Sequence, residues 1–455
     1  MQWGTHASNI DACYKLILAK RVEKMKTKMS ASLVIINGTV IDGTGVDPIR
    51  EGIVLIGENR ILAVDRADNL AVMPGAQVID ASGRTVLPGL IDSHTHDTAD
   101  PTVRRQFLKA GITSVCDLGS PLSSMPLFTE ANAEDGPAAR GYKAGPIMID
   151  NRPFPEGMEI DPGTFCQVAT VAEARAAAAD LLERGVDVTK VLLDSGWPRG
   201  AVEPLNTDQV REVVSEAHAL GVLTRAHCND VKIWHIAVDG GVDAIEHIPM
   251  PSSFNKLWNI STSNDVDVTG LTRLLSDIFS PAEQRAIEES TDSVPDLLSI
   301  PVPEYDTLLP RMVQEHIAMV PTLERGPVGD LSKLPNLLPI QRGVIQALLD
   351  IVGRFHTAGG MVVLGTDYCG GFNGPEMVMS EIRFLLAAGL SPMEVIKAGT
   401  QHAAYVSGQR DELGTLEPDK FADVIIVDGD PLTDIEVLGR VVTVINDGKI
   451  SYSHE

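Results

Sequence analysis

The amino-acid sequence predicts an α/β fold, a parallel (β/α)8 TIM barrel accompanied by a small β-sandwich domain that both chain ends build. Strand-like and helix-like segments alternate through the middle of the chain, which indicates the barrel. The length of 455 residues exceeds what one simple core accommodates. Short β-branched segments with turn signals at both ends indicate the smaller domain.

The barrel is expected over residues 88–410. Strand-like segments such as "GITSVCDLG", "VTKVLLD" and "MVVLGTD" alternate there with amphipathic segments such as "DQVREVVSEAHALG" and "PEMVMSEIRFLLAAG". Repeated β-then-α units favour a closed parallel sheet of roughly 250 residues plus insertions. An insertion at about 250–304, rich in Asn, Ser, Asp and Pro, accounts for the excess length and is either a surface segment or a lid.

The small domain is expected from residues 30–87 and 411–455. Runs such as "SLVIINGTVIDG" and "GIVLIGENRILAV" near the start, and "ADVIIVDGDP" near the end, are separated by Asn-Gly and similar turns. We expect the first part to be antiparallel and to pair with the second part. Residues 1–29 are interpreted as a dispensable N-terminal extension.

The acidic composition limits the classes of partner. The chain has 37 Lys and Arg against 62 Asp and Glu, a formal net charge of −25, which opposes nucleic-acid phosphates and anionic membranes. The expected partners are small-molecule substrates, metal cations and further copies of the chain in a homo-oligomer. The sequence has no apolar run of the roughly 18 residues that a membrane span needs. Five scattered cysteines without a CxxC pair are typical of a reducing, cytoplasmic compartment.

The segment "VLPGLIDSHTHDT", Val86–Thr98, places two histidines at the end of a predicted strand. His94 and His96 are two residues apart, so their side chains project to the same side of that strand. Two neutral imidazoles in this arrangement can form half of a divalent-metal site. Alone, such a pair is more often a polar turn with two surface histidines.

Four further polar residues interrupt or end otherwise apolar strands. Lys190 lies within "VDVTKVLLD", and the segments "GVLTRAHC", "GGVDAIEHI" and "GGMVVLGTD" place His227, His247 and Asp367 at or near their ends. Each alone has a structural explanation, such as a helix N-cap for the aspartate. Together with the histidine pair they indicate a catalytic site, because catalytic groups of these barrels lie at the carboxyl ends of the strands.

The segments "VLPGLIDSHTH", "GITSVCDLG", "VDAIEHI", "GTD" and "LGTLEPDKFADVIIVDGDP" resemble the amidohydrolase superfamily of metal-dependent hydrolases, over residues 33–450. The most similar branch is prolidase-like and imidazolonepropionase-like, and resembles N-acyl amino acid and ochratoxin amide hydrolases. The resemblance implies a barrel flanked by a β-sandwich. It also implies a set of metal ligands, namely His94, His96, Lys190, His227, His247 and Asp367, with Lys190 carboxylated as in two-metal members.

The chemistry implied by this ligand set uses two divalent metal ions. Imidazole and carboxylate ligands favour zinc, although they also accept cobalt, manganese or nickel. One ion would be held by the strand-one histidines and Asp367, the other by His227 and His247, with the Lys190 carbamate between them. A hydroxide between the metals would attack an amide carbonyl, while Asp367 takes a proton from the water and passes it to the leaving nitrogen.

Two alternatives stay open at this point. Asp230 stands three residues after His227, where deaminase and imidazolonepropionase members carry His-x-x-Glu, so a one-metal deaminase or cyclic-amide hydrolase with an ordinary Lys190 is the second hypothesis. A non-enzymatic scaffold is the third, although no ligand position is missing. The preferred function is hydrolysis of an amide in an N-acyl amino acid, a dipeptide or an ochratoxin-like compound that includes a carboxylate.

The segments "DSGWPRG", "ERGPVG" and "YCGGFNG", after strands four, seven and eight, are expected to shape the pocket, and the first supplies the candidate substrate contacts. Trp197 could form an aromatic wall and Arg199 could pair with a carboxylate, unless both are solvent-facing loop residues. The remaining histidines in helical segments, His218, His356 and His402, are assigned to helices rather than to metal binding.

Overall fold

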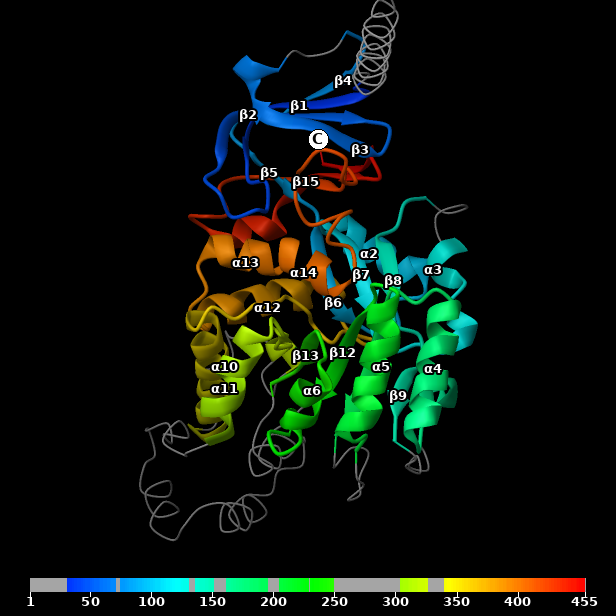
Figure 1. The fold of residues 1–455 in the computed structure, drawn as a ribbon. Coiled ribbons are helices and arrows are strands. Elements are labelled where there is room, and N and C mark those ends of the chain that lie inside the picture. The colour runs from blue at the N-terminus through cyan, green and yellow to red at the C-terminus, as the bar shows by residue number, and fades with distance from the viewer. Residues whose placement is uncertain are drawn as a thin grey trace, which may run out of the picture. The chain divides into compact units, whose positions relative to one another are not determined.

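The computed structural model describes residues 31–70, 74–130, 136–150, 161–194, 204–228, 230–248, 303–325 and 339–454. The chain divides into two compact units, one made of the residues up to Pro88 together with Asp411 onwards and the other of Gly89–Arg410 (Figure 1). The expected extension 1–29, and the expected insertion as far as residue 302, lie outside the described residues.

The first unit is an eight-stranded sheet that combines both chain ends. Its order is β17–β16–β15–β5–β1–β2–β3, and β4 pairs with β1. Alternate residues of the first strand, Leu33 and Ile35, share one buried apolar cluster with Val424 and Ile426 from the C-terminal part of the chain. The strands are β1 (Leu33–Val40), β2 (Ile49–Gly57), β3 (Arg60–Arg66), β4 (Gln77–Asp80), β5 (Thr85–Pro88), β15 (Val424–Val427), β16 (Val441–Asn446) and β17 (Lys449–Ser453).

The expectation of a purely antiparallel N-terminal part is wrong. β1 pairs antiparallel with β2, and β2 with β3, but β1 runs parallel to both β4 and β5. After β3 the chain crosses back before it re-enters the sheet, so β4 and β5 run in the direction of β1. The hydrogen-bonded strands of this unit form a single sheet, and the sandwich arrangement stays a prediction.

The second unit alternates strands and helices, as the sequence predicts. All its strand pairs are parallel, in sheets of order β6–β7–β8 and β10–β9–β11–β12–β13–β14. The strands are β6 (Leu90–Thr95), β7 (Ile112–Asp117), β8 (Arg140–Lys143), β9 (Ile147–Ile149), β10 (Phe165–Gln167), β11 (Val188–Leu193), β12 (Leu223–Cys228), β13 (Ala244–Glu246) and β14 (Ala318–Val320).

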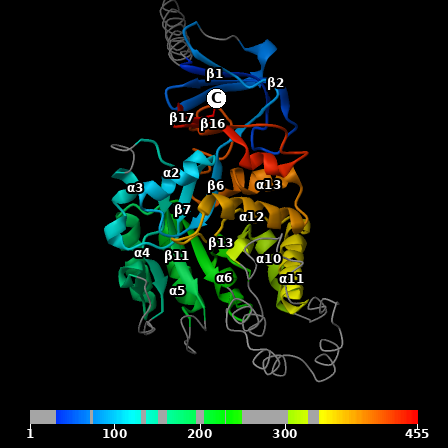
Figure 2. The same ribbon diagram turned by 180° about the vertical axis from the view of Figure 1, so that it is seen from behind.

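Helices line one side of these strands, and α4, α5 and α6 lie beside one another in both ribbon views (Figures 1 and 2). Every residue of β6, β7 and β11 is buried, as expected for parallel strands that are covered on both faces. The helices of this unit are α2 (Pro101–Lys109), α3 (Leu127–Glu130), α4 (Val171–Glu183), α5 (Thr207–Ala219), α6 (Trp234–Gly240), α10 (Pro303–Gln314), α11 (Pro339–Thr357), α12 (Gly374–Ala387), α13 (Pro392–Ala398) and α14 (Gln401–Val406).

The described strand ladders do not close into a barrel, because they form two separate sheets. The segment 361–368, expected as the last barrel strand, makes isolated parallel bridges to both sheets, Met319 to Val362 and Thr95 to Tyr368. On the other side, three residues separate the end of β8 from the start of β9. The arrangement of neighbours is the one that a barrel requires, and closure stays a prediction.

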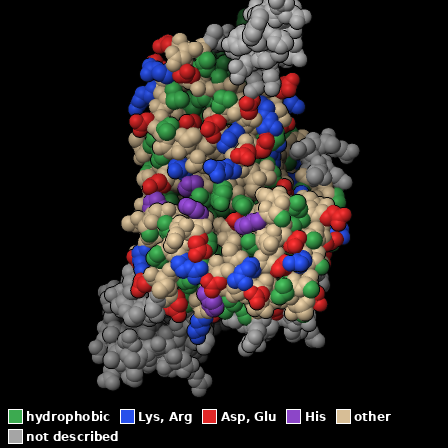
Figure 3. Space-filling model, viewed as in Figure 1, with side chains coloured by type: hydrophobic (Ala, Val, Ile, Leu, Met, Phe, Trp, Pro, Cys, Tyr) green, Lys and Arg blue, Asp and Glu red, His purple; other side chains and the backbone are tan. Residues whose placement is uncertain are grey.

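The surface of the described residues carries mixed charge. Acidic and basic side chains are interspersed over the face shown in Figure 3. Among the described helices, none combines the length and apolar character that crossing a bilayer demands.

Candidate metal centre

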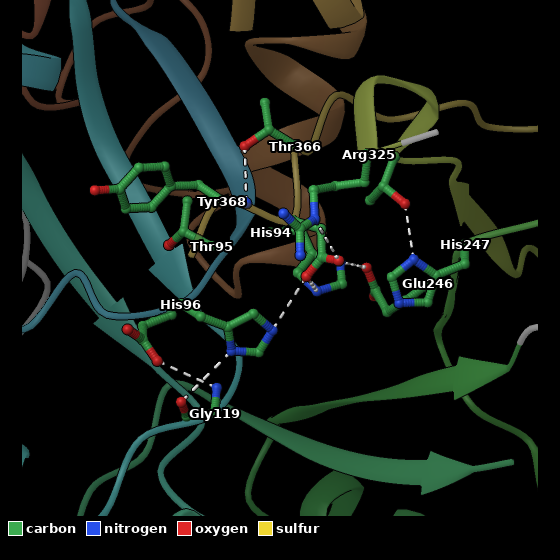
Figure 4. A network of polar contacts seen from close by, with 12 residues as sticks. His94, Thr95, His96, Gly119, Glu246, His247, Arg325, Thr366 and Tyr368 are labelled. Carbon is green, nitrogen blue, oxygen red and sulfur yellow. Dashed lines mark hydrogen bonds and ion pairs between the residues drawn. The ribbon is translucent and has the colours of Figure 1, made fainter. Parts of the chain in front are cut away.

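Three of the predicted ligands converge closely. Nε2 of His94 and Nε2 of His96 each lie 3.3 Å from Oδ1 of Asp367, and one ligand atom from each of the three residues lies within 4.8 Å of the others. His94 is buried with 1 % of its side chain exposed, whereas His96 and Asp367 retain 23 % and 21 %. Figure 4 shows the rings of His94 and His96 among their polar contacts. The cluster therefore has one side toward the interior and one side accessible.

The backbone fixes this cluster without help from a ligand. The amide N–H of Asp367 donates to the carbonyl oxygen of His94 at 2.8 Å. Asp92, fully buried, accepts hydrogen bonds from the His94 amide at 3.2 Å and from the Thr366 amide and hydroxyl at 3.1 and 2.6 Å. The Asp92 carboxylate thus links the strand that carries His94 and His96 to the segment that carries Asp367.

The electrostatics of the cluster favour an ionised Asp367 and a neutral His94 imidazole, whereas Asp367 raises the pKa of His96 against the effect of burial. Burial alone would raise the pKa of Asp367, but hydrogen bonds from His94 and His96 hold it well below its usual value. Burial lowers the pKa of His94, and the nearby Lys190 ammonium lowers it further. An anionic carboxylate with a neutral imidazole is the ligand state that a divalent cation requires.

The other predicted ligands lie beside this cluster. The ring centroid of His247 is 5.2 Å from that of His94 and 4.4 Å from that of His227. Lys190 is 2 % exposed, and burial lowers its pKa to about 8. Neither Nζ of Lys190 nor Nε2 of His227 has a hydrogen-bond partner within the described part of the chain. The nearest acidic contact of His227 is Oδ2 of Asp194 at 3.7 Å.

A buried ion pair supports the first histidine. Oε2 of Glu246 lies 2.7 Å from Nδ1 of His94, and Arg225 donates to both carboxylate oxygens of Glu246 at 2.7 and 2.9 Å. Both side chains of the Arg225–Glu246 pair are fully buried. Burial would raise the pKa of Glu246, but Arg225, Lys190 and His94 bring it well below its usual value. Since Glu246 occupies Nδ1, Nε2 of His94 is the nitrogen left for a metal.

The Arg225–Glu246 pair was not predicted from the sequence, although strand periodicity could have revealed it. In the parallel ladders, Lys190 pairs with Arg225, and His227 pairs with Glu246, so each pair projects to one face. Two signals were available. Arg225 stands two positions before His227, and Glu246 stands directly before His247 in the neighbouring strand.

A left-handed backbone conformation at His247 and Asp367 orients the side chains of these two predicted ligands. His247 follows Glu246 directly, so in a regular strand the two side chains would point to opposite faces. The positive φ of His247, 68°, breaks that alternation, and Nδ1 of His247 contacts the Thr322 hydroxyl at 2.7 Å. Asp367 also has a positive φ of 55°. Such conformations are uncommon for residues other than glycine and gather at functional sites.

Other candidates do not join this cluster. Trp197 and Arg199 lie outside the described residues. Asp230 accepts the amide N–H of Lys232 at 2.9 Å in a local turn. His218, His356 and His402 contact Asp243, Glu394 and the carbonyl oxygen of Val362, in agreement with their assignment to helices.

One further cation faces the cluster without having been predicted. Arg325 ends the short helix η5 (Leu323–Arg325), which follows β14, and its Nε lies 3.5 Å from Oδ2 of Asp367 (Figure 4). Its guanidinium carbon lies 5.1 Å from the ring centroid of Phe372. Arg325 lies in the segment "ERGPVG", which is expected to shape the pocket, but a lone arginine after a strand carries no spacing signal that would single it out.

The donor set fits a divalent cation. Two imidazole nitrogens and a carboxylate oxygen within 4.8 Å of one another are the ligand types of catalytic zinc sites. The unpartnered Nζ of Lys190 and Nε2 of His227 are buried polar atoms of the kind that folded proteins otherwise satisfy. Both features are explained if these atoms complete a metal site.

Known proteins resemble this chain along most of its length. A match to the family described as "Amidohydrolase family" covers residues 307–451. Dihydroorotase from Pelotomaculum thermopropionicum is 25 % identical over 407 residues, which is 88 % of this chain and 89 % of that protein.

Solved structures also resemble it. A putative prolidase from Bifidobacterium longum superposes with a TM-score of 0.66 at 23 % identity, covering 93 % of this chain and 96 % of that one. Ochratoxinase from A. niger superposes with a TM-score of 0.68 at 19 % identity, covering 92 % of this chain and 96 % of that one. These similarities identify a TIM-barrel-like α/β fold.

Proposed function

We propose that this chain is a metal-dependent hydrolase of carbon–nitrogen bonds within the amidohydrolase superfamily, and that it cleaves an amide bond of a small molecule with the help of bound metal ions. The observation that carries the proposal is the convergence of His94, His96 and Asp367 on one point. The proposed substrates are N-acyl amino acids, dipeptides or ochratoxin-like amides. The proposal includes a closed barrel and a cytoplasmic homo-oligomer.

The residues present fit two divalent cations, with zinc favoured. His94, His96 and Asp367 would hold one, and His227 and His247 the other, with a carboxylated Lys190 between them. The buried and unpartnered Nζ of Lys190 supports this assignment, because an isolated ammonium is costly to bury whereas an uncharged amine can react with carbon dioxide. Bound cations of this kind supply Lewis acidity, which lowers the pKa of water and polarises a carbonyl.

The chain's own residues would position the substrate and move the proton. Asp367, kept ionised by the two histidines, accepts a proton from the attacking water at a carboxylate oxygen. It then donates that proton to the leaving nitrogen, as a general base followed by a general acid. Glu246 keeps the His94 ring in one orientation throughout.

The one-metal alternative is less well supported. It needs the acid after His227 to act in the site, but Asp230 accepts a backbone N–H in its own turn. It also leaves Lys190 as a buried ammonium without a hydrogen-bond partner among the described residues. The similarity to a dihydroorotase keeps hydrolysis of a cyclic amide as the second candidate function.

The direct test is a substrate screen of the metal-loaded protein together with measurement of its metal content. We expect about two divalent ions per chain, and chelator-sensitive release of amino acids from N-acyl amino acids or dipeptides. Deamination of nucleobases, or opening of cyclic amides alone, would favour the alternative. Less than one ion per chain with no hydrolysis would favour the scaffold.

A further inference from the structure

Arg325 is a cation at the edge of the proposed metal centre. Its Nε lies 3.5 Å from Oδ2 of Asp367, and 33 % of its side chain is exposed. That separation is longer than a hydrogen bond. Among the described residues, Asp367 is the ion-pair partner that the structure gives for this guanidinium. Asp367 therefore approaches the guanidinium at one nitrogen, Nε, with the Cys369 thiol as a further neighbour, and among the described residues the structure shows no ion pair at the two terminal nitrogens.

Asp367 cannot serve as a full partner for Arg325. Its Oδ1 is approached by both His94 and His96 at 3.3 Å, and the proposed function commits the same carboxylate to a metal ion and to the proton. Bound divalent cations would repel the guanidinium rather than satisfy it. With metal ions bound, Arg325 would have no anionic partner from the protein, and a carboxylate of the substrate can take that place.

Phe372 lies beside the guanidinium of Arg325. Its ring centroid lies 5.1 Å from the guanidinium carbon, which places the cation over the ring, and the N–H donors lie along the edges of the planar guanidinium. An edge-on guanidinium matches a carboxylate with two parallel hydrogen bonds. The Phe372 ring is itself 55 % exposed, which leaves apolar surface beside the donors.

The position also sets which part of the substrate carries the anion. Asp367 is the group that donates a proton to the leaving nitrogen, and Arg325 contacts Asp367 on its other oxygen, Oδ2. A carboxylate held by Arg325 therefore lies next to the leaving nitrogen, as in an α-amino acid that is released, rather than at the far end of the acyl group.

We propose that Arg325 binds the α-carboxylate of the amino acid released from the substrate, with Phe372 against its side chain. The inference rests on the proposed function and narrows it. The substrates are amides of amino acids with a free carboxylate, and amides that lack the charge are poor substrates. Arg325 is a specificity-determining residue in this assignment.

The test compares an N-acyl amino acid with its C-terminal carboxamide, in the metal-loaded wild-type protein and in Arg325→Met and Arg325→Lys. Charge-assisted hydrogen bonds of about 1.5–3 kcal/mol correspond to roughly 10–150-fold. We expect Arg325→Met to raise KM for the acid by about that factor relative to KM for the carboxamide, and to keep the metal content. Arg325→Lys should recover part of the loss.

A matched control is Arg311→Met, which removes an arginine of similar exposure on α10 that pairs with Asp239 and Glu315. It should leave both substrates unaffected. An equal loss with acid and carboxamide in Arg325→Met would overturn the inference, since a structural or transition-state role would not distinguish them.

A binding measurement separates this inference from the proposed function. Calorimetric titration of the metal-loaded protein with a free amino acid and with its amide does not require turnover. Binding of the acid that Arg325→Met weakens at least tenfold supports the arginine subsite even if no amide is hydrolysed. Equal binding to the wild type and the variant refutes the subsite even if amides are hydrolysed.

Discussion

The two halves of the candidate metal centre differ in how the protein holds them. His94, His96 and Asp367 are fastened by the buried Asp92, by the backbone bond between Asp367 and His94, and by Glu246 behind the first ring. On the other side, Nζ of Lys190 and Nε2 of His227 are buried without a hydrogen-bond partner among the described residues. Nδ1 of His94 makes no well-directed hydrogen bond either, although Oε2 of Glu246 approaches it to 2.7 Å. The protein's own groups hold the first half in place, and we propose that bound metal ions complete the second half.

The two halves of the candidate metal centre contribute differently to the stability of the fold. Hydrogen bonds within the first half offset the cost of burying Asp92 and Glu246. In the second half, unpartnered buried nitrogens cost stability until a ligand or a modification engages them. We therefore expect substitutions in the first half to affect geometry and proton transfer, and those in the second half to affect occupancy.

The largest effect is expected for Asp367→Asn. The amide retains an oxygen for a metal but cannot accept the proton, so turnover should fall by about 10²–10⁴-fold while metal content is kept. Steady-state rates together with metal analysis measure this. Asp97→Asn is the matched control, because Asp97 is an exposed aspartate with a similar φ of 57° that accepts the Gly370 amide. An active Asp367→Asn variant would remove Asp367 as the base.

Lys190→Ala tests the second half. It removes the proposed bridging group, so hydrolysis should be abolished or strongly reduced, and the second ion should be lost before the first. Small carboxylic acids such as acetate should restore part of the activity, because they can replace a carbamate, and should not activate the wild type. Rates like those of the wild type in Lys190→Ala would eliminate the bridging role.

Glu246→Gln tests the support of the first half. The variant keeps the shape of the side chain but loses the anion that contacts Nδ1 of His94 at 2.7 Å. Removing such a partner typically weakens metal binding by about 10–100-fold. Competition with a chelator measures the affinity, and thermal unfolding without metal checks that Arg225, left without its carboxylate, has not unfolded the protein. Unchanged affinity would mean that the first half needs no such support.

The smallest effect on turnover is expected for Glu381→Gln, on α12. Glu381 is fully buried, Oε2 accepts the Glu324 amide at 2.7 Å and Oε1 has no hydrogen-bond partner within the described residues. Burial raises its pKa from 4.5 to about 8. Between those values the folded state keeps a proton that the unfolded state loses, so stability is present at low pH and falls as pH rises toward 8.

Glutamine cannot ionise, so the free energy of unfolding of Glu381→Gln should not fall over this pH range. In the wild type the fall amounts to about 2 kcal/mol between pH 6 and pH 8. Denaturant unfolding at the two pH values measures it. Glu376→Gln, on the same helix, serves as the control. The same slope in Glu381→Gln and the wild type would show that Glu381 is not the group responsible.

The sequence predicted much of this arrangement for identifiable reasons. Apolar runs with His at their ends, or with Lys within them, predicted β6, β11, β12 and β13, whereas the run that ends in Asp367 forms isolated bridges and no strand. His94, His96 and Asp367 converge because they lie at one edge of the parallel strands. The role of Glu246 was not predicted, since a strict strand period excludes adjacent Glu246 and His247 from one face. Arg325 was not predicted because its position depends on a short helix with no repeating pattern.

The left-handed backbone at His247, Thr322 and Asp367 has a consequence for protein engineering. Their φ values are 68°, 48° and 55°, and positions of this kind cost of order 1–3 kcal/mol each for residues other than glycine. A library selected for heat resistance alone would be drawn to glycine or asparagine at these positions, above all at the β-branched Thr322. Such variants would gain stability as they lost the site, so a thermostabilised form of this enzyme is best sought with all three positions held constant.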